Sequence, residues 1–201
     1  MLKSIFIFIA TVCISFSCFT QEEWVLKKNT NNIKIYTRHQ KDFAFDEYKA
    51  TTLVNTPIND VLTELLDAPK YYENCPSGIS HYIKPIGGNK HVFYAHKEFP
   101  WPIKNRDIVT LLTVKKISDK KIKLTLESLP NEIPKKDKTI RIKILMGHWL
   151  LEESNDEKTK ITQQLFLDPE GSLPPFIVNT LLIKGPYRTF SQLHYINKKA
   201  S

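Results

Sequence analysis

The feature that most constrains the fold is a run of short β-rich segments in the middle of the chain, followed by one long helical segment. The β-rich segments alternate apolar with polar residues or are rich in β-branched and aromatic residues, and turn residues separate them. The predicted strands cover residues 33–38, 43–54, 79–86, 91–99, 108–114, 122–126, 140–151 and 159–167. Because short connections join successive strands, we expect an antiparallel meander.

Helical periodicity is found at two main places. Apolar residues recur at three- and four-residue spacing after Thr56-Pro57, which predicts a helix capped by Thr56 over residues 57–66, with one further turn at 70–74. A longer helix is predicted from residue 174 or 175 to about 197, kinked at Gly185-Pro186. Only this long helix can cover the apolar face of so large a sheet. We therefore expect an α+β fold in which a curved antiparallel sheet wraps around the C-terminal helix and leaves an internal hydrophobic cavity.

The N-terminus has the layout of a secretory signal. A weakly basic start is followed by an uncharged apolar run of about 15 residues, shorter than the ~20 residues that span a bilayer. We expect cleavage after Thr20, so that residues 1–20 are a signal peptide and residues 21–201 form one exported domain, periplasmic or secreted. Two alternatives remain: lipidation of Cys18, for which Ser15-Phe16-Ser17 is a poor lipoprotein box, and an uncleaved membrane anchor.

Composition excludes several classes of protein and site. A hydrophobic fraction of 41% and a charged fraction of 25% are typical of a soluble globular chain, not of a disordered or multi-span membrane protein. Three cysteines are too few for a disulfide framework or a four-ligand zinc site. The chain also lacks HExxH, GxSxG, Walker and dinucleotide-binding motifs. We therefore expect no cofactor and no metal, although the absence of these motifs does not by itself exclude an enzyme.

The net charge of +8 suggests acidic partners. Many lysines lie in the middle strands, and Arg141 and Lys143 occupy alternate positions, which predicts that both lie on the outer, solvated face of the sheet. The functional alternative is transient contact of this face with an anionic membrane surface. Nucleic-acid binding is not expected, because the scattered aromatic residues do not form a stacking platform.

The most unusual segment is Pro100-Trp101-Pro102, followed by Arg106-Asp107. Two prolines around a tryptophan remove backbone donors and restrict φ, so a rigid loop is expected. One interpretation is a structural corner, in which Trp101 packs on the core and Arg106 pairs with Asp107 or Glu98. The other is that the loop forms one wall of a cavity mouth and Arg106 is a polar anchor inside it.

These residues resemble the "PWP…RD" signature of START domains, the StAR-related lipid-transfer family within the helix-grip, or Bet v 1-like, superfamily. The resemblance covers essentially the whole chain after the signal peptide. Further matching positions, in order, are Trp24, Ile35-Tyr36-Thr37-Arg38, Tyr48-Lys49-Ala50, Leu65-Leu66-Asp67, Gly147-His148-Trp149, and Asp168 to Pro174 with Val178-Asn179. One departure is Glu73-Asn74-Cys75-Pro76, where the family usually has a tryptophan.

The resemblance implies a helix-grip fold with a hydrophobic tunnel, gated by the C-terminal helix and the loop around Trp101. It also implies non-catalytic binding of one lipid or sterol-like ligand, with transfer as an extension, by a protein that we expect to be a monomer. The residues expected to contact the ligand are Arg106, Glu98, Trp101, Tyr94, Phe176, Asn179 and Leu182. The alternative is a helix-grip enzyme, cyclase-like or hydrolase-like, that acts on an apolar substrate. It requires two titratable groups within hydrogen-bond reach, such as Glu98 with His96 or Tyr94.

Overall fold

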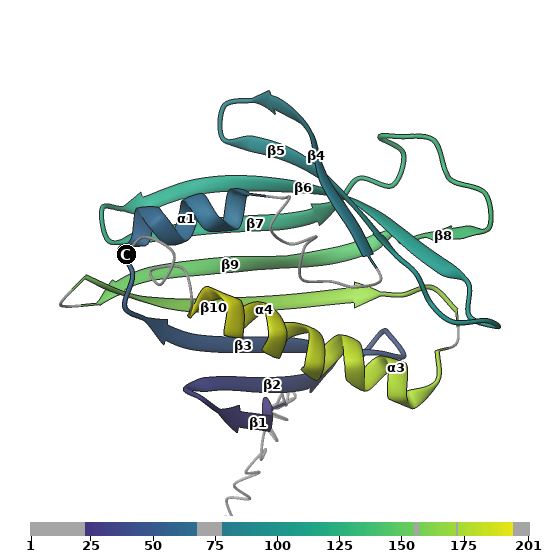
Figure 1. The fold of residues 1–201 in the computed structure, drawn as a ribbon, viewed down its shortest axis with the longest axis horizontal. Helices are drawn as coiled ribbons and strands as arrows, with labels where there is room; N and C mark the ends of the chain where they lie inside the picture. The colour runs from purple at the N-terminus through teal and green to yellow at the C-terminus, as the bar shows by residue number, and fades with distance from the viewer. Residues whose placement is uncertain (1–22, 68–77, 155–156, 172, 195–201) are drawn as a thin grey trace, which may run out of the picture.

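The computed structural model describes residues 23–67, 78–154, 157–171 and 173–194, and its main element is one ten-stranded sheet (Figure 1). The strands are β1 (Val25–Thr30), β2 (Ile33–His39), β3 (Asp46–Val54), β4 (Gly78–Gly87), β5 (Lys90–Lys97), β6 (Asn105–Ser118), β7 (Lys121–Ser128), β8 (Thr139–Arg141), β9 (Ile144–Ser154) and β10 (Lys158–Asp168). Their order across the sheet is β1-β2-β3-β10-β9-β7-β6-β5-β4. Neighbours in this order are antiparallel, whereas β8 pairs with β6 in parallel.

The pairing of β3 with β10 joins the N-terminal strands to the rest of the sheet. Its register runs from Val54 opposite Thr159 to Tyr48 opposite Leu165. The β1–β2 hairpin turns at Asn31 and Asn32, whose φ angles of 52° and 59° are those of a tight turn that asparagine tolerates. This pairing joins strands that are far apart in the sequence and places β1, β2 and β3 in the same sheet as the later strands.

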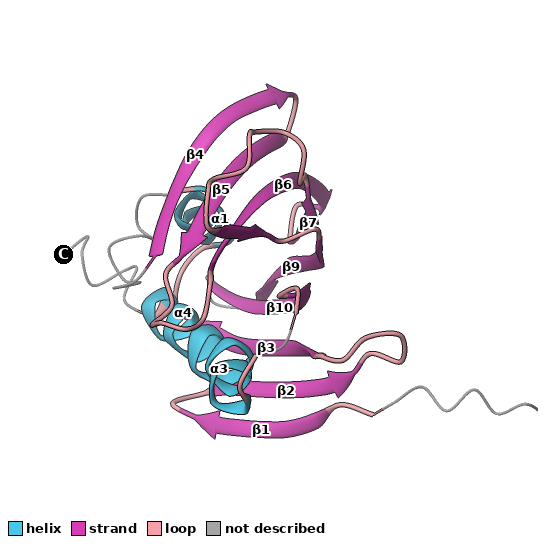
Figure 2. Ribbon diagram, turned by 90° about the vertical axis from the view of Figure 1, so that its right-hand side faces the viewer, coloured by secondary structure: helices cyan, strands magenta, loops and turns pink. Residues whose placement is uncertain are grey.

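The helices are α1 (Ile58–Leu66), α3 (Pro175–Asn179), the π-helical turn η1 (Thr180–Lys184) and α4 (Gly185–Leu193). Figure 2 shows the sheet curving around the C-terminal helical segment, which lies on its concave side. There Phe190 of α4 stacks on Trp149 of β9, with ring centroids 5.6 Å apart. The helix-grip architecture predicted from the sequence is confirmed. Among the described residues, no helix combines the length and apolar character needed to cross a membrane.

The irregularity expected at Gly185-Pro186 takes the form of the π turn η1. The Gly185 N–H donates to the carbonyl of Thr180, five residues earlier. Pro186 has no N–H, and in a regular α-helix its ring would collide with the carbonyl of Leu182. The wider π turn places this proline in the helix without that collision.

Three local predictions are corrected by the structure. Thr56 does not cap α1, which begins after Pro57 without a side-chain cap; the Thr56 carbonyl instead accepts from the Thr159 hydroxyl at 2.7 Å. The predicted strand 140–151 is split into β8 and β9, because residues 139–141 pair with β6 in parallel whereas β9 pairs with β7 and β10. Strand β1 was not predicted, since its largely exposed residues lack alternation. The predictions for residues 1–20 and 70–74, and for Cys75, lie outside the described residues.

Candidate functional site

A cavity of about 380 Å³ lies between the concave face of the sheet and the C-terminal helical segment. Its floor comes from inward-facing residues of β3, β9 and β10, and its roof comes from α3, η1 and α4. The wall is mainly apolar and includes Trp149, Leu165, Leu182 and Pro186. A cavity of this size and character is typical of a site for a small hydrophobic ligand.

The floor of the cavity contains a buried polar pair. The Tyr48 hydroxyl donates to the Gln163 Oε1 atom at 2.8 Å. Burial raises the pKa of the Tyr48 hydroxyl far above its ordinary value, so the group stays protonated. Trp149 lies directly opposite Gln163 in the β9–β10 register. Within the described part of the chain, neither the Gln163 amide nitrogen nor the Trp149 indole N–H donates a hydrogen bond to the protein.

A second hollow, of about 230 Å³, borders the same stretch of helix. It shares Phe45, Asp46, Val178 and Leu182 with the larger cavity. The π turn η1 contributes to both linings, and none of its own residues is fully buried. This turn is therefore a part of the cavity roof that no fully buried residue anchors.

Arg106 has partners other than those predicted. Its guanidinium donates to the carbonyls of Lys104 at 2.7 Å, Pro169 at 2.9 Å and Glu170 at 3.3 Å. Burial lowers the pKa of Arg106 from its ordinary value. The predicted pairing with Asp107 or Glu98 is wrong: Asp107 bonds elsewhere, and Glu98 is exposed. Because Pro169 lines the cavity, Arg106 fastens the Trp101 loop to the cavity rim.

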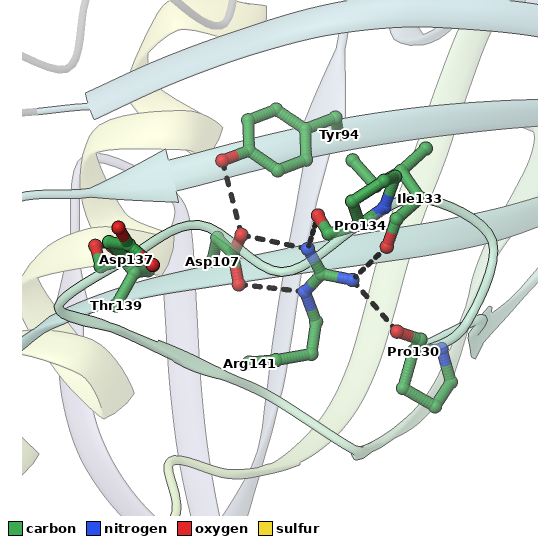
Figure 3. A network of polar contacts seen from close by, with 8 residues as sticks. All are labelled: Tyr94, Asp107, Pro130, Ile133, Pro134, Asp137, Thr139 and Arg141. Atoms are coloured by element: carbon green, nitrogen blue, oxygen red, sulfur yellow. Dashed lines mark hydrogen bonds and ion pairs between the residues drawn. The ribbon is translucent and has the colours of Figure 1, made fainter.

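Asp107 and Arg141 form a buried ion pair on the opposite face of the sheet (Figure 3). The Arg141 Nε and Nη2 atoms donate to the two Asp107 oxygens at 2.7 and 3.0 Å, and the Tyr94 hydroxyl donates to the same carboxylate at 3.2 Å. Arg141 also donates to the carbonyls of Pro130, Ile133 and Pro134. The hydrogen bond with Asp107 raises the pKa of Arg141. Arg141 is on the outer face as predicted, but it is buried rather than solvated, because the 129–138 segment covers it.

Trp101 is 92% exposed, so its predicted packing on the core is wrong. The loop that carries it is closed by two hydrogen bonds: the Phe99 N–H donates to the Asn105 Oδ1 atom at 3.1 Å, and the Ile103 N–H donates to the Pro100 carbonyl at 3.0 Å. A large aromatic side chain is therefore held in solvent on a braced loop.

The remaining predicted ligand contacts are divided among different places. Leu182 lines both hollows and Asn179 lines the smaller one. Tyr94 belongs to a small core on the outer face, with Val92 and Val109, so it points away from the cavity. Phe176 lies in α3, and its side chain is outside the described part.

The pairs named as examples for the enzyme alternative, Glu98 with His96 or Tyr94, are not assembled among the described residues. Tyr94 bonds to Asp107 and Glu98 is exposed, while the buried His96 Nδ1 atom has no hydrogen-bond partner there. The described residues also contain no group of three metal-ligating side chains.

None of the strand residues of the cavity floor was predicted as a ligand contact, including the polar Tyr48 and Gln163. Tyr48 and Trp149 were noted only as positions that match the family. Alternation separates the two faces of a strand but does not say which of them points into the cavity.

Comparison with known proteins shows matches over nearly the whole chain. The START domain family matches residues 10–192. The crystal structure of a STAR-related lipid transfer protein from Xanthomonas axonopodis is 27% identical, with a TM-score of 0.77, over 87% of this chain and 98% of that one. Human StAR-related lipid transfer protein 5 is 20% identical, with a TM-score of 0.72, over 88% and 86% of the two chains. An uncharacterized protein of Pseudomonas aeruginosa is 24% identical over 89% of this chain and 88% of its own length.

Proposed function

We propose that this chain, which belongs to the START domain family, binds a single lipid or other hydrophobic molecule without covalent chemistry. The observation that carries the proposal is the apolar cavity between the concave face of the sheet and the C-terminal helical segment. Burial of each methylene of a ligand contributes ~0.8 kcal/mol, so an acyl chain or a sterol body gains enough to be held there. The 27% identity to a STAR-related lipid transfer protein supports lipid as the ligand class.

In this proposal the ligand enters and leaves past the π turn η1, a part of the cavity roof that no fully buried residue anchors. The turn η1 borders both hollows, and none of its residues is fully buried. Arg106 connects the Trp101 loop to the cavity rim through the carbonyls of Pro169 and Glu170. The C-terminal helical segment and the Trp101 loop thus act as neighbouring parts of one gate. Release of the lipid into a membrane, and uptake of another from it, would make the protein a lipid-transfer protein.

The proposal also includes export of the protein from the cytoplasm. If residues 1–20 are a cleaved signal peptide, the protein meets its ligand outside the cytoplasm, as a monomer. The intact mass of the protein recovered after export measures this directly. A chain that begins at Gln21 supports it, and a full-length or lipid-modified chain contradicts it.

The test of lipid binding is native mass spectrometry of the purified protein, followed by organic extraction of any bound molecule and uptake assays with sterols, fatty acids, monoacylglycerols and phospholipids. The blocking variant Leu182→Trp adds bulk inside the cavity and should reduce uptake at least tenfold. Leu53→Trp is the matched control, because Leu53 is 44% exposed and lies outside the cavity lining. An empty protein that takes up none of these lipids would overturn the proposal.

A further inference from the structure

We infer that the cavity selects a lipid whose buried polar group is an uncharged oxygen acceptor, such as an ester carbonyl, over one with an ionised headgroup. The inference rests on the proposed function and specifies the ligand class for the same cavity. It is carried by the polar groups of the cavity floor and by the charges around them.

The cavity floor offers hydrogen-bond donors without protein acceptors. Gln163 uses its Oε1 atom to accept from Tyr48, which fixes the amide with its NH₂ group unused. Trp149, directly across the strand pair, has an indole N–H that can only donate. Within the described residues both donors are left for a ligand. Both residues line the cavity, so a ligand in it can supply the missing acceptor oxygen.

The charges near this patch oppose an anionic headgroup. The charged side chain on the inward-facing side of β3 is the carboxylate of Asp46, two residues from Tyr48 and on the same face. This carboxylate is 38% exposed and lies 3.3 Å from the His39 Nδ1 atom, so it supplies no positive charge to the patch and disfavours a carboxylate or phosphate bound beside it. Removing an ion from water requires a paired charge, and the patch supplies only neutral donors.

Neither of the two arginines near the cavity supplies a buried counter-ion for an anionic headgroup, and solvent screens the charge of the exposed Arg188. Arg106 directs its guanidinium at the carbonyls of Lys104, Pro169 and Glu170, so its donors are already used. Arg188 contributes to the lining, but its residue is exposed. A neutral acceptor is therefore the polar group that this part of the cavity satisfies best.

The experiment compares three ligands with the same acyl chain by displacement of a fluorescent lipid: the methyl ester, the free acid at about pH 9, where it is ionised, and the alkane. The ester should bind roughly tenfold more tightly than the ionised acid.

Two variants test the role of the Gln163 amide. Gln163→Met removes the amide at similar length and should weaken binding of the ester about three- to tenfold while leaving binding of the alkane unchanged. Tyr48→Phe, which releases the Gln163 amide, should also lower the ester-to-alkane ratio, and thermal unfolding verifies that both variants fold.

The outcomes separate the two proposals. Equal or tighter binding of the ionised acid, or an ester-to-alkane ratio that neither variant changes, overturns the inference but leaves lipid binding intact. A protein that binds none of the three ligands overturns the proposed function, and this inference with it.

Discussion

At the scale of single residues, Arg106 and Asp107 are adjacent in β6 but contact different parts of the molecule, because successive side chains of a strand point to opposite faces. Arg106 faces the cavity side and holds the carbonyls of Pro169 and Glu170. Asp107 faces the outer side and pairs with Arg141, both side chains being 1% exposed. The motif that these two residues form therefore fixes two segments: the rim of the cavity on one face and the 129–138 segment on the other.

The buried ion pair predicts a large effect of a small substitution. Asp107→Asn leaves Arg141 charged and buried without its counter-ion, so the free energy of unfolding should fall by about 3–5 kcal/mol. Urea unfolding followed by fluorescence measures this change. Asp119→Asn is the control, because Asp119 is 95% exposed and its ion pair with Lys116 lies on the surface, where solvent screens it. Similar losses in the two variants would contradict the structural role of the pair.

At the scale of elements, the C-terminal helical segment is anchored unevenly. Its last turns bury Phe190 and Leu193, and the His194 Nε2 atom lies 2.8 Å from the Thr52 Oγ1 atom. Thr52 donates its hydroxyl to the Asn32 carbonyl, so the His194 N–H is the donor to Thr52. The π turn η1, in contrast, buries no residue. If the helix gates the cavity, as proposed above, we expect it to open at η1 while α4 stays folded.

Replacing Gly185-Pro186 with Ala-Ala tests this hinge. Alanine at position 186 restores a backbone N–H, and both replacements favour a regular helix by roughly 1 kcal/mol for glycine and 3 kcal/mol for proline. The stiffer segment should slow lipid exchange with vesicles, measured by transfer of a fluorescent lipid. Lys184→Ala, at an exposed neighbouring position, should leave the rate unchanged. Exchange at the original rate in the Ala-Ala variant would exclude the hinge.

At the scale of the whole molecule, the ten-stranded sheet separates an inner face that holds the cavity from an outer face that holds the Asp107–Arg141 pair. Trp101 projects from the loop that Arg106 ties to the cavity rim. Tryptophan favours the interface between headgroups and acyl chains, and a basic protein is attracted to anionic headgroups. We therefore expect the molecule to meet a membrane with the end that carries Trp101.

Trp101→Ala tests that orientation. Because Trp101 is 92% exposed, the free energy of unfolding should change by less than about 0.5 kcal/mol. Binding to vesicles that contain anionic lipid should nevertheless fall several-fold in a sedimentation assay. Ile117→Ala is the control, since Ile117 is an apolar residue, 50% exposed, at the other end of β6. Equal losses from both substitutions would show that the two ends are equivalent and would contradict the orientation.

Sequence alone determined the architecture because the relevant signals are local. Alternation identified most strands, three- and four-residue spacing identified α1, and Gly185-Pro186 identified the irregular point of the C-terminal helix. The Trp101 loop was identified from a short stretch of residues, and the family resemblance was identified from short motifs spread along the chain. Strand β1 was missed because its exposed residues carry no such signal.

Only the tertiary structure decided the cavity and the partners of its rim. A period of two separates the faces of a strand but does not say which face points inward, so Tyr94 was placed on the wrong side. Tyr48 and Gln163, 115 residues apart, meet because β3 pairs with β10 at the far side of the meander. Arg141 is buried because the 129–138 segment covers it, and alternation alone predicted a solvated charge. These features depend on contacts between distant segments, which local spacing does not encode.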